Sequence, residues 1–141
     1  MILLDTNVVS EPWKPEPDPR VIAWIDAQAV ETLYLSAITV AELRLGIALM
    51  PAGKRRSIFY DRLEQDVLPV FTGRVVPFDL PAAGAYATLM SKVKAAGRTV
   101  GMTDGYIAAI AIAQGFQVAT CDISPFHTAG LVVINPWTSC P

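Results

Sequence analysis

The sequence predicts one α/β domain over residues 1–141, with a mostly parallel sheet that is covered by helices on both faces. Short apolar runs alternate along the chain with longer segments of helical periodicity, as they do where helices connect parallel strands. Hydrophobic residues make up 52% of the chain and charged residues 17%, which is enough apolar material for one core. No repeat, low-complexity tract or long linker divides the chain.

The N-terminal elements follow from local signals. The apolar run 1–4 predicts a strand, and the four prolines of residues 11–19 predict a stiff, irregular connection. Asp18 and Pro19 form an N-cap and first-turn pair, which opens a helix that we expect to reach about residue 28.

The next segment predicts a strand over 32–35, a helix that begins after Ser36 and ends near Pro51, and a further helix over about 53–66. Ser36 is the expected N-cap of the first of these helices. The apolar residues expected to face the core from the two helices are Ile38, Leu45, Leu49, Ile58 and Leu63.

The second half of the chain repeats the alternation. The expected elements are, in order, a strand at 74–77, a helix at 81–97, a helix at 103–113, and strands at 118–120 and 131–134. Asp79 is the expected N-cap of the long helix. Gly97 and Gly115 are natural helix ends.

Four acids stand apart from other charges, and we name them the acid cluster: Asp5, Glu42, Asp104 and Asp122. Asp5 is the only charged residue among the first ten, and Arg44 is the only other charged residue between 32 and 53 besides Glu42. No Lys or Arg follows Arg98. Because an isolated buried carboxylate is costly, the pattern predicts that a metal ion is the missing cationic partner.

The other nine acids follow a different pattern, because eight of them lie in the polar stretches 11–31 and 61–66 and Asp79 opens a helix.

The members of the acid cluster are expected to lie at one edge of the predicted sheet. Asp5 and Asp122 follow strands at their C-terminal ends, where parallel α/β sheets form ligand sites, and Asp104 begins a helix on that side. Glu42 is expected to point along an apolar helix face towards the core.

Each acid has a simpler explanation when it is taken alone. Asp104 is also typical of a helix first turn, Asp5 of a turn with Asn7, and Asp122 of the start of a loop. Together, a ligand set of carboxylate oxygens that includes no Cys or His favours Mg²⁺ or Mn²⁺ and predicts phosphodiester or phosphate hydrolysis. The single histidine, His127, is expected at the surface rather than as a base.

Four stretches resemble, in order, the acidic motifs of the PIN domain: residues 1–7, 36–43, 103–109 and 119–122, the last with Asn135-Pro136-Trp137. The similarity spans nearly the whole chain. It is strongest to the VapC toxin family, and within it to FitB-like members, which share Ser10-Glu11-Pro12 and the run 40–46. Many VapC toxins have an Asp-Phe pair where this chain has Pro125-Phe126, which leaves Asp122 as the only candidate for the fourth acid.

The resemblance implies an α/β/α sandwich and a Mg²⁺- or Mn²⁺-dependent ribonuclease, the toxin of a type II toxin-antitoxin system. It implies a homodimer and a cognate VapB- or FitA-like antitoxin of the ribbon-helix-helix class, through which the complex binds promoter DNA. By position it makes the acid cluster both metal-binding and catalytic. It also implies that nearby polar side chains support those ligands or bind water, namely Thr6, Asn7 and Thr120.

Two alternatives remain open from the sequence. One is a phosphatase of the haloacid-dehalogenase kind, although Asn7 stands where that chemistry usually has a second Asp. The other is a subunit of a DNA-bound antitoxin-toxin complex with weak or no nuclease activity, which fits a net charge of −2 and basic residues that cluster only modestly, at 54–62 and 92–98. An antitoxin Arg that enters the acidic pocket would be a plausible inhibitor.

The sequence also predicts a soluble, cytoplasmic protein without a membrane partner. The N-terminus lacks the basic segment of a signal peptide. The uncharged apolar run of residues 105–121 is interrupted by polar residues and is shorter than the roughly 20 apolar residues of a membrane helix.

Overall fold

The computed structural model describes residues 1–138, so the last three residues of the expected domain lie outside the described part. Its five strands form one sheet in the order β3-β2-β1-β4-β5, and all four neighbouring pairs are parallel. The strands are β1 (Ile2–Leu4), β2 (Leu33–Ser36), β3 (Val75–Val76), β4 (Gln117–Ala119) and β5 (Val133–Ile134). The predicted parallel α/β architecture is therefore confirmed.

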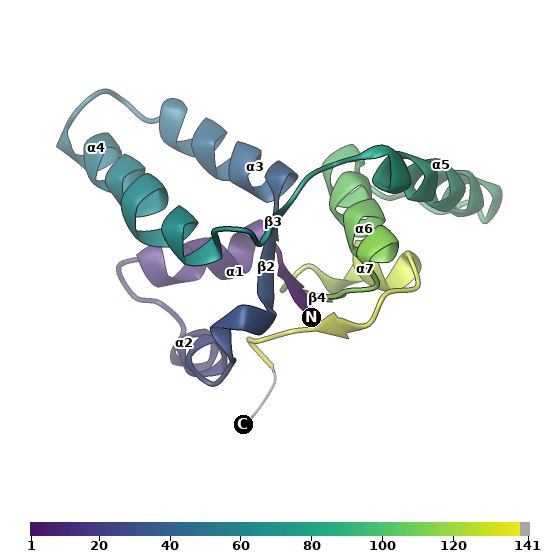
Figure 1. Ribbon diagram of the computed structural model, residues 1–141, viewed down its shortest axis with the longest axis horizontal. Coiled ribbons are helices and arrows are strands. Elements are labelled where there is room, and N and C mark those ends of the chain that lie inside the picture. The colour runs from purple at the N-terminus through teal and green to yellow at the C-terminus, as the bar shows by residue number, and fades with distance from the viewer. Residues whose placement is uncertain (139–141) are drawn as a thin grey trace.

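Helices cover both faces of the sheet, with α1 to α4 on one side and α5 to α7 on the other (Figure 1). The helices are α1 (Thr6–Ser10), α2 (Pro19–Asp26), α3 (Ala37–Ala48), α4 (Lys54–Asp61), α5 (Leu80–Ala95), α6 (Met102–Gln114) and α7 (Ile123–Thr128). Shorter segments are the 3-10 turns η1 (Glu11–Trp13), η2 (Val30–Thr32) and η4 (Leu68–Phe71), and the π-helical η3 (Arg62–Val67).

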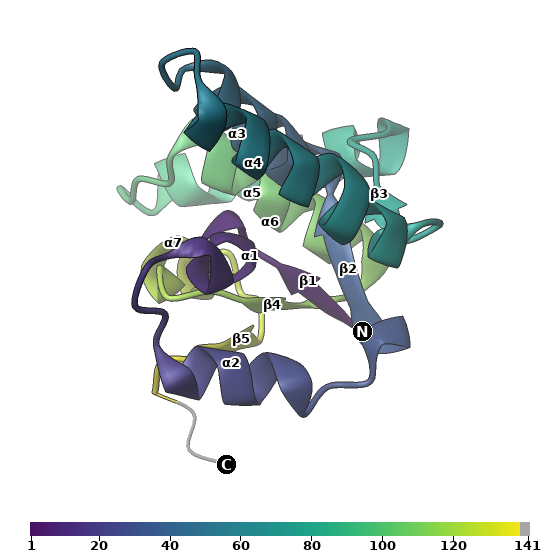
Figure 2. The ribbon, with the colours of Figure 1, turned by 90° about the vertical axis from the view of Figure 1, so that its left-hand side faces the viewer.

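The core consists of two layers on opposite faces of the central strand. Leu3 packs with α5, α6 and α7, whereas Leu4 packs with α1 and α3, because successive strand side chains point to opposite faces. Burying each of these leucines stabilises the fold by about 1.5–3 kcal/mol. Figure 2 shows β1 between β2 and β4, with α1 following directly from its end. The N-terminal strand thus occupies the middle of the sheet.

The three predicted N-caps are confirmed by their hydrogen bonds. Ser36 Oγ accepts from the backbone N–H of Thr39 at 3.0 Å. Asp18 Oδ1 accepts from the N–H of Arg20 at 2.9 Å, and Asp79 Oδ1 from that of Ala82 at 3.1 Å. Each cap satisfies a backbone donor that the first helical turn leaves unpaired, and so determines where α3, α2 and α5 begin.

Two short helical regions were not expected from the sequence. The stretch 11–19 contains η1, so it is not wholly irregular, and α1 precedes it directly. Residues 123–128, expected to be a loop, form α7. These helices are only five or six residues long, and buried residues such as Val8 and Phe126 anchor them to the core. Tertiary packing rather than local propensity supports helices of that length.

The predicted inward face of α3 is wrong. Leu45 and Leu49 are 59% and 75% exposed, and Ile38 is only partly buried. The buried side chains of α3 are Thr39, Val40, Leu43 and Ile47. This helix is apolar nearly all round, so its hydrophobic spacing does not distinguish the inward face from the outward one.

The predicted inward face of the next helix is half correct. Leu63 is fully buried, but Ile58 is 43% exposed. Residues five apart lie about 140° apart around an α-helix, so the two side chains do not share a face. Among residues 1–138, no helix combines the length and the apolar character that are needed to cross a membrane.

Candidate active site

Asp5 is a buried carboxylate at the C-terminal end of the central strand. Its side chain is the N-cap of α1, and the residue is only 4% exposed. Oδ1 accepts from the backbone N–H of Thr6 at 2.8 Å. Oδ2 accepts from Thr120 Oγ1 at 2.8 Å and from Asn7 Nδ2 at 3.3 Å. Three donors therefore hold the carboxylate in one orientation.

Thr120 ties the end of β4 to the end of β1. Its Oγ1 accepts from Asn7 Nδ2 at 3.1 Å and from the backbone N–H of Asp122 at 3.0 Å. Asn7 Oδ1 accepts from the N–H of Cys121 at 3.3 Å. Because β1 and β4 are parallel neighbours, the loop that carries Asp122 begins beside Asp5. The structure thus brings Asn7 and Thr120 into direct contact with Asp5.

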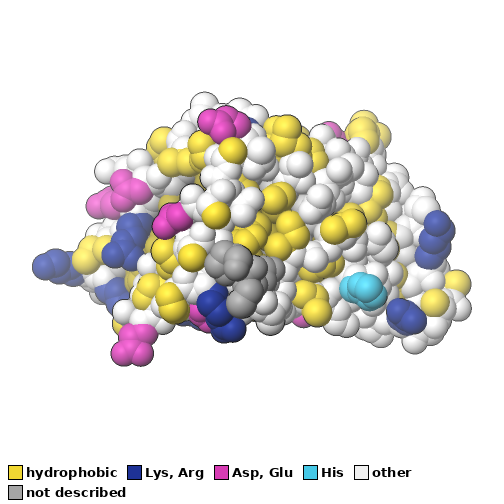
Figure 3. Space-filling model, turned by 90° about the horizontal axis from the view of Figure 1, so that it is seen from below, with side chains coloured by type: hydrophobic (Ala, Val, Ile, Leu, Met, Phe, Trp, Pro, Cys, Tyr) yellow, Lys and Arg dark blue, Asp and Glu magenta, His cyan; other side chains and the backbone are white. Residues whose placement is uncertain are grey.

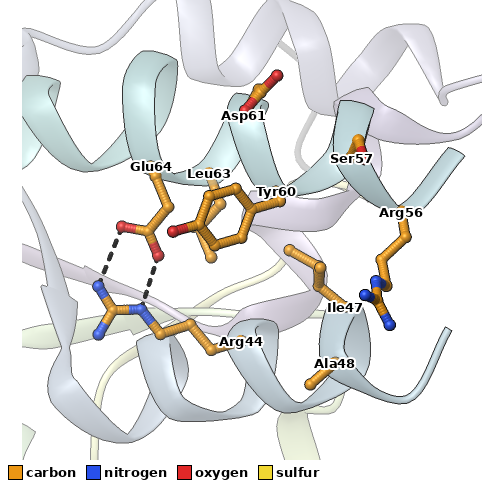
Figure 4. Close-up of a pocket in the computed structure, with 9 residues that line it drawn as sticks. All are labelled: Arg44, Ile47, Ala48, Arg56, Ser57, Tyr60, Asp61, Leu63 and Glu64. Carbon is orange, nitrogen blue, oxygen red and sulfur yellow. Dashed lines mark hydrogen bonds and ion pairs between the residues drawn. The ribbon is translucent and has the colours of Figure 1, made fainter. Parts of the chain in front are cut away.

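Glu42 reaches the same region from α3, but it does not point to the core as expected. The residue is exposed, and its Oε1 accepts from Thr6 Oγ1 at 2.8 Å. Arg44 is not its partner, because the guanidinium bonds Glu64 at 2.8 and 3.1 Å (Figure 4). Glu42 is exposed because α3 is rotated so that Leu43, and not Glu42, faces the core.

Asp104 is the third residue of α6 and completes the set. Burial raises its pKa to about 6, and the negative charges of Asp5, Asp122 and Glu42 add to the rise. Burial also raises the pKa of Asp5, with smaller contributions from Glu42 and Asp122, against the lowering effect of the Thr120 hydrogen bond. The four predicted acids therefore lie within electrostatic reach of one another.

No member of the acid cluster takes part in an ion pair between residues of the described chain, 1–138. In the same range, no three Asp, Glu, His or Cys side chains lie close enough together to coordinate a metal ion. This spacing is expected of carboxylates that influence one another's charge, because like charges keep them apart when no cation lies between them. An oxygen-only donor set fits Mg²⁺ or Mn²⁺, which keep several water ligands and need few protein contacts.

One buried acid was missed by the sequence reasoning. Glu11, assigned to a polar stretch, is only 2% exposed and pairs with Lys14, with Oε1 and Nζ 2.8 Å apart. A signal was present, because Glu11 is three residues after the buried Val8 and so shares its helical face. The many charged residues of the stretch 11–31 concealed this signal.

Two hollows lie beside α3. A groove of about 390 Å³ includes Thr6 and Glu42 and continues over Trp13, Lys14 and Phe59; we call it the Lys14 groove. A pocket of about 640 Å³ between α3 and α4 is bordered by the Arg44–Glu64 pair (Figure 4). The larger pocket contains no member of the acid cluster, so the smaller groove is the one connected to the candidate site.

The single histidine lies at the surface and away from the residues named above as site residues. His127 is exposed in α7, as predicted, and is the cyan side chain of Figure 3. On the face shown there, the Lys and Arg side chains are scattered and do not form one continuous patch.

The chain is similar to known proteins over almost its full length. The PIN domain family model matches residues 2–131. A VapC ribonuclease, Y4jK, of Sinorhizobium fredii (strain NBRC 101917 / NGR234) is 66% identical over 137 residues, covering 97% of this chain and 98% of the relative. Toxin FitB of Neisseria gonorrhoeae (strain ATCC 700825 / FA 1090) is 53% identical over 137 residues, 97% of this chain and 99% of the relative.

A solved structure shows the same fold. The structure of FitAB bound to an IR36 DNA fragment contains a chain that is 50% identical, with a TM-score of 0.96, covering 100% of this chain and 99% of that one. The resemblance read from the acidic motifs, including the α/β/α sandwich, is therefore confirmed. The chain belongs to the PIN domain family, and within that family to the group that includes the VapC and FitB proteins.

Proposed function

We propose that this protein is the toxin of a type II toxin-antitoxin system and hydrolyses phosphodiester bonds of RNA with Mg²⁺ or Mn²⁺. The observation that carries the proposal is the acid cluster, in which four carboxylates from separate elements influence each other's charge without a cationic partner among residues 1–138. The relatives named VapC ribonuclease and Toxin FitB support the same assignment. Membership of the PIN family argues against the phosphatase alternative.

The residues of the site have distinct proposed tasks. Asp5 and Asp104 would hold the ion, with Glu42 and Asp122 completing its surroundings. A bound Mg²⁺ or Mn²⁺ activates water and stabilises the leaving oxygen of a phosphodiester. The hydrogen bonds from Thr6, Asn7 and Thr120 would orient the ligands, as described for Asp5 and Glu42 above.

The partners follow from the relatives. We propose a cognate VapB- or FitA-like antitoxin of the ribbon-helix-helix class, a homodimeric toxin, and promoter DNA contacted only through the antitoxin. The DNA-bound FitAB structure supports this arrangement. It is equally compatible with the second candidate function, a subunit of a DNA-bound regulatory complex with weak or no nuclease activity.

The decisive experiment is RNA cleavage by purified, antitoxin-free protein with Mg²⁺, with Mn²⁺ and with chelator. Asp5→Asn and Asp104→Asn should each reduce cleavage at least about 100-fold, because even groups that only support a metal ligand contribute about 10- to 100-fold. Asp26→Asn is the matched control, since Asp26 is an exposed acid at the end of α2.

The outcomes separate the two candidates. Chelator-sensitive cleavage by the wild type that both site variants lose supports the ribonuclease. Full activity in both variants would exclude the assigned roles. A folded wild type that cleaves no RNA in a total cellular pool, yet binds promoter DNA together with its antitoxin, would favour the regulatory subunit.

A further inference from the structure

The chain carries an ion pair between a buried carboxylate and an exposed ammonium next to the acid cluster. The side chain of Glu11 is only 3% exposed, whereas that of Lys14 is 61% exposed, and Oε1 and Nζ lie 2.8 Å apart. A buried carboxylate is costly unless a cation meets it. The hydrogen bond and the charge of Glu11 raise the pKa of Lys14, so the ammonium stays charged. The pair therefore fixes one positive charge at the protein surface.

That charge lies at the rim of the candidate site. Lys14 lines the Lys14 groove together with Thr6 and Glu42, which are hydrogen-bonded to each other. It also lies near enough to Cys121, the neighbour of Asp122, to influence the pKa of that thiol. Lys14 thus lies close to the start of α1, which Asp5 caps, and to the loop after β4, which carries Asp122.

The groove continues from Lys14 over aromatic side chains to a second cation. The ring centroids of Trp13 and Phe59 are 5.9 Å apart, and Arg55 Cζ lies 5.6 Å from the centroid of Phe59. Proteins commonly bind single-stranded nucleic acid with aromatic side chains and nearby cations. The bases stack on the aromatic rings, and the backbone phosphates contact the cations.

We propose that Lys14, held in place by Glu11, binds a backbone phosphate of single-stranded RNA beside the bond to be cleaved, and that the strand continues along the groove towards Arg55. The proposal rests on the ribonuclease function argued above. RNA is favoured over a protein as the occupant, because Lys14 and Arg55 line the same groove as two neighbouring aromatic rings, and single-stranded RNA presents both phosphates and bases to such a surface.

The test measures RNA affinity separately from cleavage. The full-length Asp104→Asn protein is mixed with a labelled single-stranded RNA in chelator, and fluorescence anisotropy is followed over a series of KCl concentrations. Loss of one phosphate contact should reduce the slope of log affinity against log salt by about 0.7. Lys14→Ala and Arg55→Ala should each show this reduction, Lys14→Arg should restore it, and Lys92→Ala on the distant α5 should not change it.

The other outcomes distinguish failure of this proposal from failure of the ribonuclease function. Lys14→Gln replaces Lys14→Ala if the alanine variant does not fold, because glutamine can still donate to Glu11 without carrying charge. An unchanged salt slope in a folded Lys14 variant overturns the proposal, and so does unchanged RNA binding accompanied by lost binding to the cognate antitoxin. A Lys14-dependent slope in a wild type that does not cleave RNA would contradict the ribonuclease function alone. Wild-type cleavage with an unchanged slope would contradict this proposal alone.

Discussion

At the scale of single residues, the hydroxyl of Thr120 is central to the site. It is fully buried, donates to Asp5 at 2.8 Å and accepts from Asn7 and from the N–H of Asp122. The same hydrogen bond opposes the rise in the pKa of Asp5. One side chain therefore connects two acids of the cluster.

Replacing Thr120 by valine keeps its shape and removes these bonds. We expect a loss of about 1–3 kcal/mol in the free energy of unfolding, because buried polar partners lose a hydrogen bond. Urea denaturation in chelator at neutral pH measures the effect, and the pKa of Asp5 should rise further. Thr88→Val, on the exposed side of α5, is the control. Equal stability of the two variants would contradict this account of Thr120.

Asp104 makes stability depend on pH. Its pKa rises from 3.8 to about 6 on folding, so between these values the folded protein binds more protons than the unfolded chain. Stability should therefore fall as the pH rises from about 4 to about 6. Because the side chain is partly exposed, solvent screening reduces the effect to on the order of 1 kcal/mol.

The matching variant is Asp104→Asn, studied without divalent ions. It should be more stable than the wild type above about pH 6, by on the order of 1 kcal/mol, and the difference should vanish near pH 4. Urea denaturation at several pH values measures this. If the wild type and the variant depend on pH in the same way, Asp104 does not have a raised pKa in the folded protein. Asp26→Asn controls for the loss of one charge.

At the scale of elements, α3 shows how a helix acquires its orientation. Ser36 determines where it begins, but its nearly uniform apolar surface leaves its rotation open. Contact with β2 and α1 selects the face that contains Leu43 and Ile47, and leaves Leu45 and Leu49 in solvent. The same rotation places Glu42 beside Thr6.

The chosen face can be tested by two leucine truncations in the same helix. Leu43→Ala should reduce the free energy of unfolding by about 2–5 kcal/mol, because it leaves a cavity in the core. Leu49→Ala, 75% exposed, should change it by less than about 0.5 kcal/mol. Chemical denaturation of the antitoxin-free protein, at one fixed protein concentration, gives both values. A larger loss for Leu49→Ala would mean that the helix has the opposite orientation, or that an interface covers Leu49.

At the scale of the whole molecule, parallel strands bring distant residues to one edge. Asp5 follows β1 and Asp122 follows β4, the neighbouring strand, although 117 positions separate them in the sequence. Asp104 arrives at the start of α6 and Glu42 from α3. The cluster is thus a property of the assembled sheet and its helices, and it forms only in the folded state.

A site that exists only in the folded state links ion binding to stability. Mn²⁺ or Mg²⁺ at 100 times its dissociation constant should stabilise the protein by about 2.7 kcal/mol. The melting temperature of chelator-treated protein should therefore rise on addition of the ion, and Asp104→Asn should abolish most of the rise. An equal rise in the wild type and in Asp104→Asn would show that the ion binds elsewhere.

Much of the fold was accessible from the sequence, because the signals were local. The caps at Ser36 and Asp79 and the alternation of apolar runs with helical periods each depend on a few neighbouring residues. Short elements escaped prediction, because packing stabilises α1 and α7. The burial of Glu11 escaped as well, since the polar composition of residues 11–31 concealed its helical spacing from the buried Val8.

The sequence by itself determined the parallel α/β class, the family and the identity of the four isolated acids, because periodicity, caps and lone charges are written in consecutive residues. Only the tertiary structure decided that Glu42 meets Thr6 from an exposed position, that Thr120 connects Asp5 to the loop of Asp122, and that Lys14 lies beside them. Those relations depend on how helices rotate and strands pair, and long-range packing sets both.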